Sequence, residues 1–141
     1  MKITNRFQKI ISFVKDIKAN RQTGKNFHVS VALKGGNIIE YGINYYNKIT
    51  PKKYGKYKST RTNNKNEFYQ AGLHSEVDLI MKLENTDIDI HKLTLLNIRI
   101  DNNNNIAIAT PCPNCMRILK QNKFKKIFYT IDNETIGKVI Y

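Results

Sequence analysis

The chain has 141 residues, of which 24 are Lys or Arg and 11 are Asp or Glu, so its formal net charge is +13. This length fits one domain with a sizeable core and is too short for two catalytic domains. No apolar run approaches the roughly 20 residues that cross a bilayer, which excludes a membrane-spanning helix. The two cysteines, Cys112 and Cys115, are three residues apart. Their spacing argues against a disulfide-stapled secreted domain and favours metal or redox chemistry in a reducing compartment.

The first 24 residues are expected to form a helix that lies against a sheet. Thr4 or Asn5 can cap its start, and Gly24 marks its end. The apolar stretch at residues 10–14 is too short for a signal peptide, and no small-residue cleavage site follows it, so we expect an intracellular, cytoplasmic protein. The helix is predicted from apolar residues that recur at helical spacing, namely Phe7, Ile10, Ile11, Val14 and Ile17.

Residues 27–33 and 38–43 have the composition of two β-strands. They meet at a turn that contains Gly35 and Gly36, which predicts a β-hairpin. Residues 46–70 then form a stretch rich in Lys, Asn and Tyr that shows no usable periodicity. We expect a long basic loop there, and a loop of that length in a compact domain is usually functional or disordered.

The positive charge is concentrated in the first half of the chain. Residues 1–75 contain 15 basic and 3 acidic residues, whereas residues 76–141 contain 9 and 8. Basic side chains interleaved with tyrosines can bind phosphates and stack on bases, and a mononucleotide phosphate would suit them as well as a polymer. Genome composition is an equally good explanation, because Lys, Asn and Ile all have A/T-rich codons. The basic residues of the 47–66 run are Lys48, Lys52, Lys53, Lys56, Lys58, Arg61 and Lys65.

The sequence of the second half of the chain predicts alternating helices and strands. A helix should follow Gly72, a strand should cover residues 93–100, and residues 101–105 should form a turn. Residues 106–109 extend that strand or begin another. A third helix should start around residues 110–113, because the Pro residues there are favoured at a first helical position.

Two further strands are predicted at residues 126–131 and 135–141. The gap between them is too short for a helical crossover, so they should form an antiparallel C-terminal hairpin. The sequence shows no internal repeat and no second domain. We therefore predict a single α/β domain over residues 1–141, a three-layer α/β/α sandwich whose helices cover a mixed sheet of about five strands.

Cys112 and Cys115 are the first candidates for metal ligation. At positions i and i+3 of a first helical turn they point the same way, and a helix start stabilises thiolates. His74 is the best third ligand, because it stands just before Ser75 and Glu76 at the start of the second expected helix. Three protein ligands and one water form a catalytic zinc site, whereas a structural site needs a fourth protein ligand. Glu76, as a carboxylate that does not bind the metal, can then act as a general acid and base.

The other two histidines are interpreted as residues that do not bind the metal. His28 stands within an expected strand and is read as an ordinary strand residue. His91 follows a polar stretch and is read as a solvated loop residue. The predicted zinc site therefore depends on His74.

Two half-motifs carry a resemblance to a known family. His74-Ser75-Glu76 is followed by Pro111-Cys112-Pro113-Asn114-Cys115, and each opens an expected helix with a strand between them. The pattern H-x-E…P-C-x-x-C is that of zinc-dependent nucleobase deaminases. The sequence therefore resembles the cytidine/deoxycytidylate deaminase superfamily. The hairpin that ends at Gly42-Ile43-Asn44 is similar to the first two strands of that family, so the resemblance covers most of residues 27–141.

The resemblance implies a cytidine-deaminase-like fold and a zinc ion held by His74, Cys112 and Cys115. It implies that a water activated at the metal attacks the ring carbon bearing the exocyclic amine. Glu76 would protonate the neighbouring ring nitrogen and then pass a proton to the departing ammonia. The implied activity is hydrolytic deamination of a nucleobase, most of all cytosine to uracil, in a nucleoside, a nucleotide or a single-stranded nucleic acid.

The resemblance also implies substrate contacts. Asn44 would contact the sugar, backbone groups at Ser75 and Cys112 would help to fix the base and the water, and Thr110 is counted among the substrate-binding residues as well. Related small deaminases often assemble into dimers or tetramers, so a homo-oligomer is a further expectation. No membrane partner is expected.

The chain departs from the usual family pattern at several points. Ser75 replaces the more common Ala, and Asn44 is followed by Tyr45-Tyr46-Asn47 rather than by the nearby Glu of enzymes that act on free cytidine. The chain has no Trp, although polynucleotide-editing deaminases carry one just before the Pro-Cys pair. The alternative function is a non-catalytic, zinc-stabilised nucleic-acid-binding module on a deaminase scaffold. Glu76 favours the enzyme, because a purely structural site would not need it.

Overall fold

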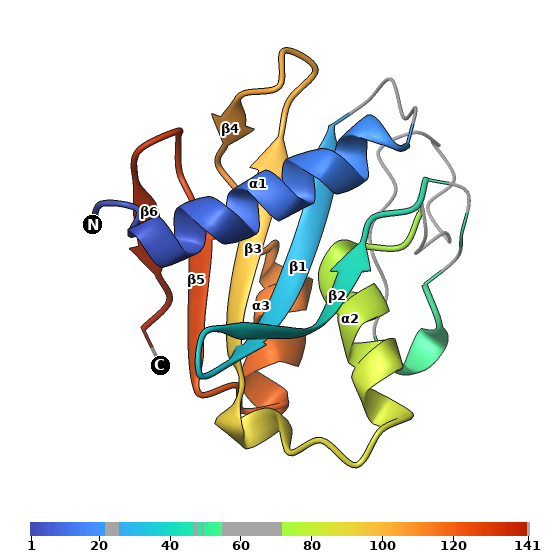
Figure 1. The fold of residues 1–141 in the computed structure, drawn as a ribbon. Helices are drawn as coiled ribbons and strands as arrows, with labels where there is room; N and C mark the ends of the chain where they lie inside the picture. The colour runs from blue at the N-terminus through green and yellow to red at the C-terminus, as the bar shows by residue number, and fades with distance from the viewer. Residues whose placement is uncertain (22–25, 47, 49, 55–71, 141) are drawn as a thin grey trace.

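The computed structural model describes residues 1–21, 26–46, 48, 50–54 and 72–140 (Figure 1). None of the helices in this described part is long and apolar enough to cross a membrane. The helices are α1 (Asn5–Ala19), α2 (Ser75–Glu84) and α3 (Pro113–Gln121), with short 3-10 helices η1 (Lys52–Tyr54) and η2 (Ile90–Lys92). The strands are β1 (Phe27–Lys34), β2 (Asn37–Ile43), β3 (Thr94–Ile100), β4 (Ile106–Ala107), β5 (Lys126–Thr130) and β6 (Ile136–Lys138).

The strands form one mixed sheet. The order across it is β2-β1-β3-β5-β6, and β4 pairs with the end of β3. β3 and β5 are parallel, because α3 lies between them in the chain, and every other pair in the described residues is antiparallel. The expected C-terminal hairpin is thereby confirmed as β5–β6. The sheet has six strands in the described part of the chain rather than about five, since residues 106 and 107 form a short strand of their own.

Helices cover both faces of the sheet, which confirms the three-layer α/β/α architecture (Figure 1). α1 packs its buried residues against one face, and α2 and α3 pack against the other. Alternate residues of a strand point to opposite faces. On β3, Leu96, Ile98 and Ile100 accordingly lie in the core under α1, whereas Leu95 lies in the core under α2 and α3. Asn97, two residues after Leu95, therefore points to the face of the sheet that α2 and α3 cover.

The N-terminal helix begins where the sequence predicts and ends earlier. The Thr4 side chain accepts a hydrogen bond from the backbone N–H of Phe7, so Thr4 is the N-cap. The helix ends at Ala19 because the Asn20 side chain and backbone N–H both bond to the carbonyl group of Asp16. Most of the basic loop expected at residues 46–70 lies outside the described residues.

Gly42 brings β2 into close contact with the first turn of α2. A Cβ atom at this position would lie 2.4 Å from both the carbonyl oxygen of Ser75 and the backbone nitrogen of Leu79. We predict that Gly42→Ala lowers the free energy of unfolding by roughly 3 kcal/mol, because two backbone segments would have to separate. Urea unfolding measures the loss. Gly35→Ala is the control: a Cβ there meets nothing within 4 Å, so it should cost only about 1 kcal/mol of left-handed backbone strain. Equal losses would contradict the close approach.

Candidate metal and active site

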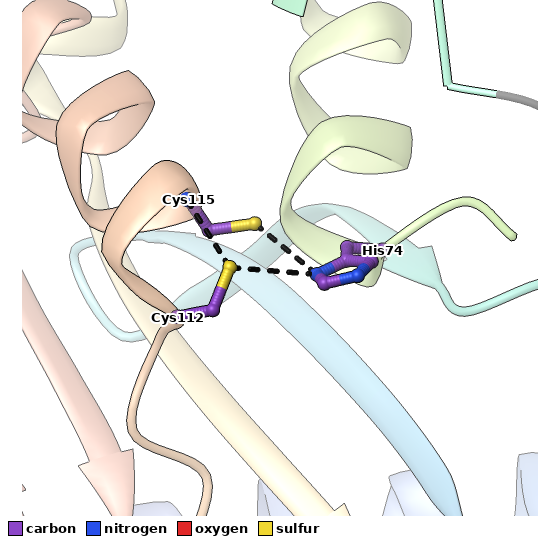
Figure 2. Close-up of side chains that lie close together, drawn as sticks. All are labelled: His74, Cys112 and Cys115. Atoms are coloured by element: carbon purple, nitrogen blue, oxygen red, sulfur yellow. Dashed lines mark hydrogen bonds between the residues drawn. The ribbon is translucent and has the colours of Figure 1, made fainter. Parts of the chain in front are cut away.

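The three predicted ligands come together at the starts of two helices. His74 is the N-cap residue of α2, Cys112 is the N-cap residue of α3, and Cys115 lies in the first turn of α3. Figure 2 shows both cysteine side chains pointing from α3 toward the imidazole ring of His74. His74 Nδ1 lies 3.7 Å from Cys112 Sγ and 3.4 Å from Cys115 Sγ. Residues that are 38 and 41 positions apart in the chain thus face one point.

The distances and the donor atoms fit a zinc ion. A tetrahedral zinc with Zn–N of about 2.0–2.1 Å and Zn–S of about 2.3 Å would separate such a nitrogen and sulfur by about 3.6 Å. The two observed distances lie on either side of this value. Among the described residues, His74, Cys112 and Cys115 are the group of His, Cys, Asp and Glu side chains that could hold a metal. Two sulfurs and one imidazole give three protein donors, the number typical of catalytic zinc sites, rather than the four that close a structural site.

The electrostatics of the group favour the thiolate form of Cys112. A hydrogen bond with the Cys115 side chain, most of all, together with His74 and the backbone N–H of Cys115, lowers the pKa of Cys112 to about 4 against the opposing effect of burial. Burial alone would lower the pKa of His74, but the neighbouring Cys112 and the charge of Glu76 raise it. Thiolates are the form of cysteine that binds metals. Cys112 is therefore a thiolate at neutral pH, the form that can bind a metal.

Glu76 lies in the first turn of α2 and is buried, as the general acid and base of the predicted site should be. Its Oε2 accepts a hydrogen bond from Asn97 Nδ2 at 3.0 Å, and its Oε1 lies 3.1 Å from the Ser75 hydroxyl group. Glu76 is not part of the metal-holding group. The carboxyl group therefore stands beside the three ligands and is available for proton transfer.

A cavity of about 230 Å³ opens beside these residues, and His74, Glu76 and Cys112 form part of its wall. This volume corresponds to that of about eight water molecules, which leaves room for a pyrimidine base. Tyr45 and Tyr46 also line the cavity and supply aromatic surface. The cavity can therefore take up a flat base beside His74, Glu76 and Cys112.

Comparisons with known proteins give a structural match and no sequence match. No protein-family model matches the chain, and no curated protein matches its sequence. The solved structure of dCMP deaminase from the cyanophage S-TIM5 in complex with dCMP and dUMP superposes with a TM-score of 0.53 at 17% identity, covering 90% of this chain and 82% of that one. The apo form of the same enzyme gives a TM-score of 0.54 at 18% identity over 90% and 84% of the two chains. The chain has the cytidine-deaminase-like fold.

This deaminase-like fold places the predicted substrate-binding residues around the cavity. Asn44, Ser75 and Thr110 all line it. The amide of Asn44 accepts a hydrogen bond from the backbone N–H of His28 at 3.0 Å and donates one to the Asn26 carbonyl group at 3.3 Å. An Asn amide has two donor hydrogens and two acceptor lone pairs, so the described residues leave one of each for a ligand. These contacts fix the orientation of Asn44 toward the cavity.

His28 is a residue of the site that the sequence interpretation missed. It lines the cavity, on the same face of β1 as Ser30. Burial, most of all, and the positive charges of Arg99 and His74 lower the pKa of His28 to about 4. The imidazole is therefore neutral at physiological pH and can donate or accept a hydrogen bond. His91 lies exposed in η2, in agreement with its interpretation as a solvated residue.

Proposed function

We propose that this protein is a zinc-dependent hydrolytic deaminase that removes the exocyclic amine of a nucleobase. The observation that carries the proposal is a buried carboxyl group, Glu76, beside three converging metal-type donors at the wall of a base-sized cavity. The deaminase-like fold supports the same reaction class. Cytosine is the proposed base, and uracil the product.

His74, Cys112 and Cys115 would hold the zinc ion, which when bound would make a water nucleophilic at neutral pH. Glu76 accepts the proton that this water loses. It then donates a proton to the ring nitrogen next to the reacting carbon. The carbon–nitrogen bond to the exocyclic amine breaks, a proton reaches the leaving nitrogen through Glu76, and the products are a carbonyl group and ammonia.

A phosphate-bearing substrate is supported by cations near the cavity. Lys48 Nζ lies 3.8 Å and Arg21 Cζ lies 4.9 Å from the centre of the Tyr45 ring, and Tyr45 lines the cavity. Two cations beside this wall would attract a phosphate that projects from the cavity. The cyanophage enzyme, whose structure was solved with dCMP and dUMP, has the same fold. We therefore place a cytosine nucleotide first among the proposed substrates, ahead of the nucleoside and of a single-stranded nucleic acid.

The test is a screen of the zinc-loaded, full-length protein for ammonia release. Cytidine, deoxycytidine, their monophosphates and single-stranded DNA and RNA would be supplied in turn. We expect turnover of a cytosine nucleotide that changes little with salt. Turnover only of single strands, falling steeply with salt, would reassign the substrate to a polymer. Binding of nucleic acid without ammonia release from any of these compounds would instead favour the non-catalytic module.

A further inference from the structure

Four polar side chains are buried together where the first turn of α2 meets β1 and β3. The exposed fractions are 0% for Ser30 on β1, 2% for Ser75, 6% for Glu76 and 4% for Asn97 on β3. Ser30 and Asn97 are direct partners in the register of β1 and β3. Burying polar groups is unfavourable unless they are hydrogen-bonded, so their mutual contacts decide whether the group can be stable there.

The four side chains form a closed ring of contacts. Asn97 Nδ2 donates to Glu76 Oε2 at 3.0 Å, and Ser30 Oγ donates to Asn97 Oδ1 at 2.6 Å. The hydroxyl groups of Ser30 and Ser75 are 2.8 Å apart, and Ser75 Oγ lies 3.1 Å from Glu76 Oε1. The second hydrogen of the Asn97 amide points to the Ala109 carbonyl oxygen at 3.4 Å. A flipped amide would set its oxygen against two acceptors, so the orientation of Asn97 is fixed.

Both oxygens of the Glu76 carboxyl group are held by side chains of this ring. Asn97 Nδ2 donates to Oε2, and the Ser75 hydroxyl group donates to Oε1. Ser30 is hydrogen-bonded to both of these neighbours, because its hydroxyl group donates to Asn97 Oδ1 and lies 2.8 Å from Ser75 Oγ. Ser30 therefore ties together the two side chains that hold Glu76.

We propose that Ser30, Ser75 and Asn97 are positioning residues that hold the carboxyl group of Glu76 in place for proton transfer at the cavity. The two oxygens of Glu76 are fixed by different donors, so the carboxyl group cannot rotate without breaking a hydrogen bond. This inference rests on the proposed function. It also gives a role to Ser75, which stands where related deaminases commonly have Ala, since an alanine cannot link Glu76 to Ser30.

The first test measures Tm in the zinc-loaded full chain. Ser30→Ala should lower Tm by about 4 °C, because roughly one hydrogen bond is lost. In the Asn97→Ala background the same change should lower Tm by about half as much, because the hydrogen bond from Ser30 to Asn97 is already absent. Equal shifts in the native and Asn97→Ala backgrounds would overturn the ring. Glu134→Gln, on an exposed residue, is the control background and should leave the effect of Ser30→Ala unchanged.

The second test is kinetic. Asn97→Asp keeps the size of the side chain but replaces the donor to Glu76 with an oxygen, so kcat should fall by roughly 10–100-fold while KM changes little. Ser75→Ala should lower kcat in the same direction, and Ser75→Thr, which retains the hydroxyl group, should restore it. Thr130→Val is the matched control, since Thr130 is a fully buried hydroxyl on β5 outside the ring. It should lower Tm and leave kcat within about twofold of the native value, because its loss changes stability alone.

The two tests separate this inference from the proposed function. If Glu76→Gln is inactive but Asn97→Asp and Ser75→Ala turn over at the native rate, the positioning role is wrong and the deaminase assignment stands. If the native protein deaminates nothing, the proposed function is wrong. In that case the Tm comparison still tests whether the four side chains are hydrogen-bonded to one another, because it needs no turnover.

Discussion

Glu76→Ala should reduce kcat for cytosine deamination by about 10³-fold while zinc stays bound and the fold is kept. Proton transfer by a positioned side chain contributes roughly 10²–10⁴-fold to a rate, and Glu76 is the carboxyl group that lines the cavity beside the three ligands. The measurement is ammonia release at saturating substrate, with the zinc content of the same sample determined by elemental analysis. KM should change less than kcat, because Glu76 acts mainly on the transition state.

The matched control is Glu134→Ala. Glu134 is exposed and lies between β5 and β6, so its removal takes away the same charge without touching the cavity. We expect native kcat and native zinc content for this variant. Unchanged turnover in Glu76→Ala would rule out Glu76 as the proton carrier, and a parallel loss of zinc would assign it to metal binding instead.

The candidate metal ligands could be predicted from the sequence because local rules place them. The i, i+3 spacing of Cys112 and Cys115 at a helix start sets their relative direction whatever the rest of the chain does. His74 and Glu76 lie on either side of Ser75 at another helix start, where residues two apart can still face one pocket. Local rules do not show that the two helix starts lie close together in the fold. That expectation came from the resemblance to the deaminases.

The positioning residues could not be predicted, because their role depends on strand register. Ser30 and Asn97 are single polar residues in otherwise apolar strands, and nothing within either strand shows that they face each other. Their contact arises because β1 and β3 pair antiparallel with Ser30 opposite Asn97. The same register sets His28 opposite Arg99, two residues along the strands from that pair. An ordinary strand histidine and a cavity histidine look alike until that pairing is known.

The sequence defined the bounds of the short strands less well, for a related reason. β4 has two residues, and its backbone is held by pairing with Arg99 and Ile100 rather than by any strand periodicity of its own. Residues 135–141 have strand-like composition, but only Ile136–Lys138 pair regularly with β5. Composition predicts where a strand is possible. The length of the neighbouring strand decides how much of it forms.

Removing one metal ligand should have the largest effect on the stability of the protein. In Cys115→Ser we expect zinc binding to fall by more than about 10²-fold and deamination to be lost, because a buried serine hydroxyl is not a thiolate. Cys115 is fully buried and its Sγ lies 3.4 Å from His74 Nδ1, so no neighbouring water can easily replace it. When free zinc exceeds Kd by about 1,000-fold, binding stabilises the native protein by about 4 kcal/mol, which for this chain length corresponds to a Tm shift of more than about 10 °C.

A chelator makes that prediction specific to the metal. EDTA should lower the Tm of the native protein by the whole shift that zinc binding contributes, more than about 10 °C. It should leave the Tm of Cys115→Ser and of His74→Ala almost unchanged, because these variants have no bound zinc to lose. His91→Ala is the matched control for His74→Ala, since His91 is exposed and lies in η2 outside the metal-holding group. Its response to EDTA should equal that of the native protein. If Cys115→Ser and the native protein lost the same Tm on chelation, the ion would be bound elsewhere, and the role of Glu76 beside it would have to be reassigned as well.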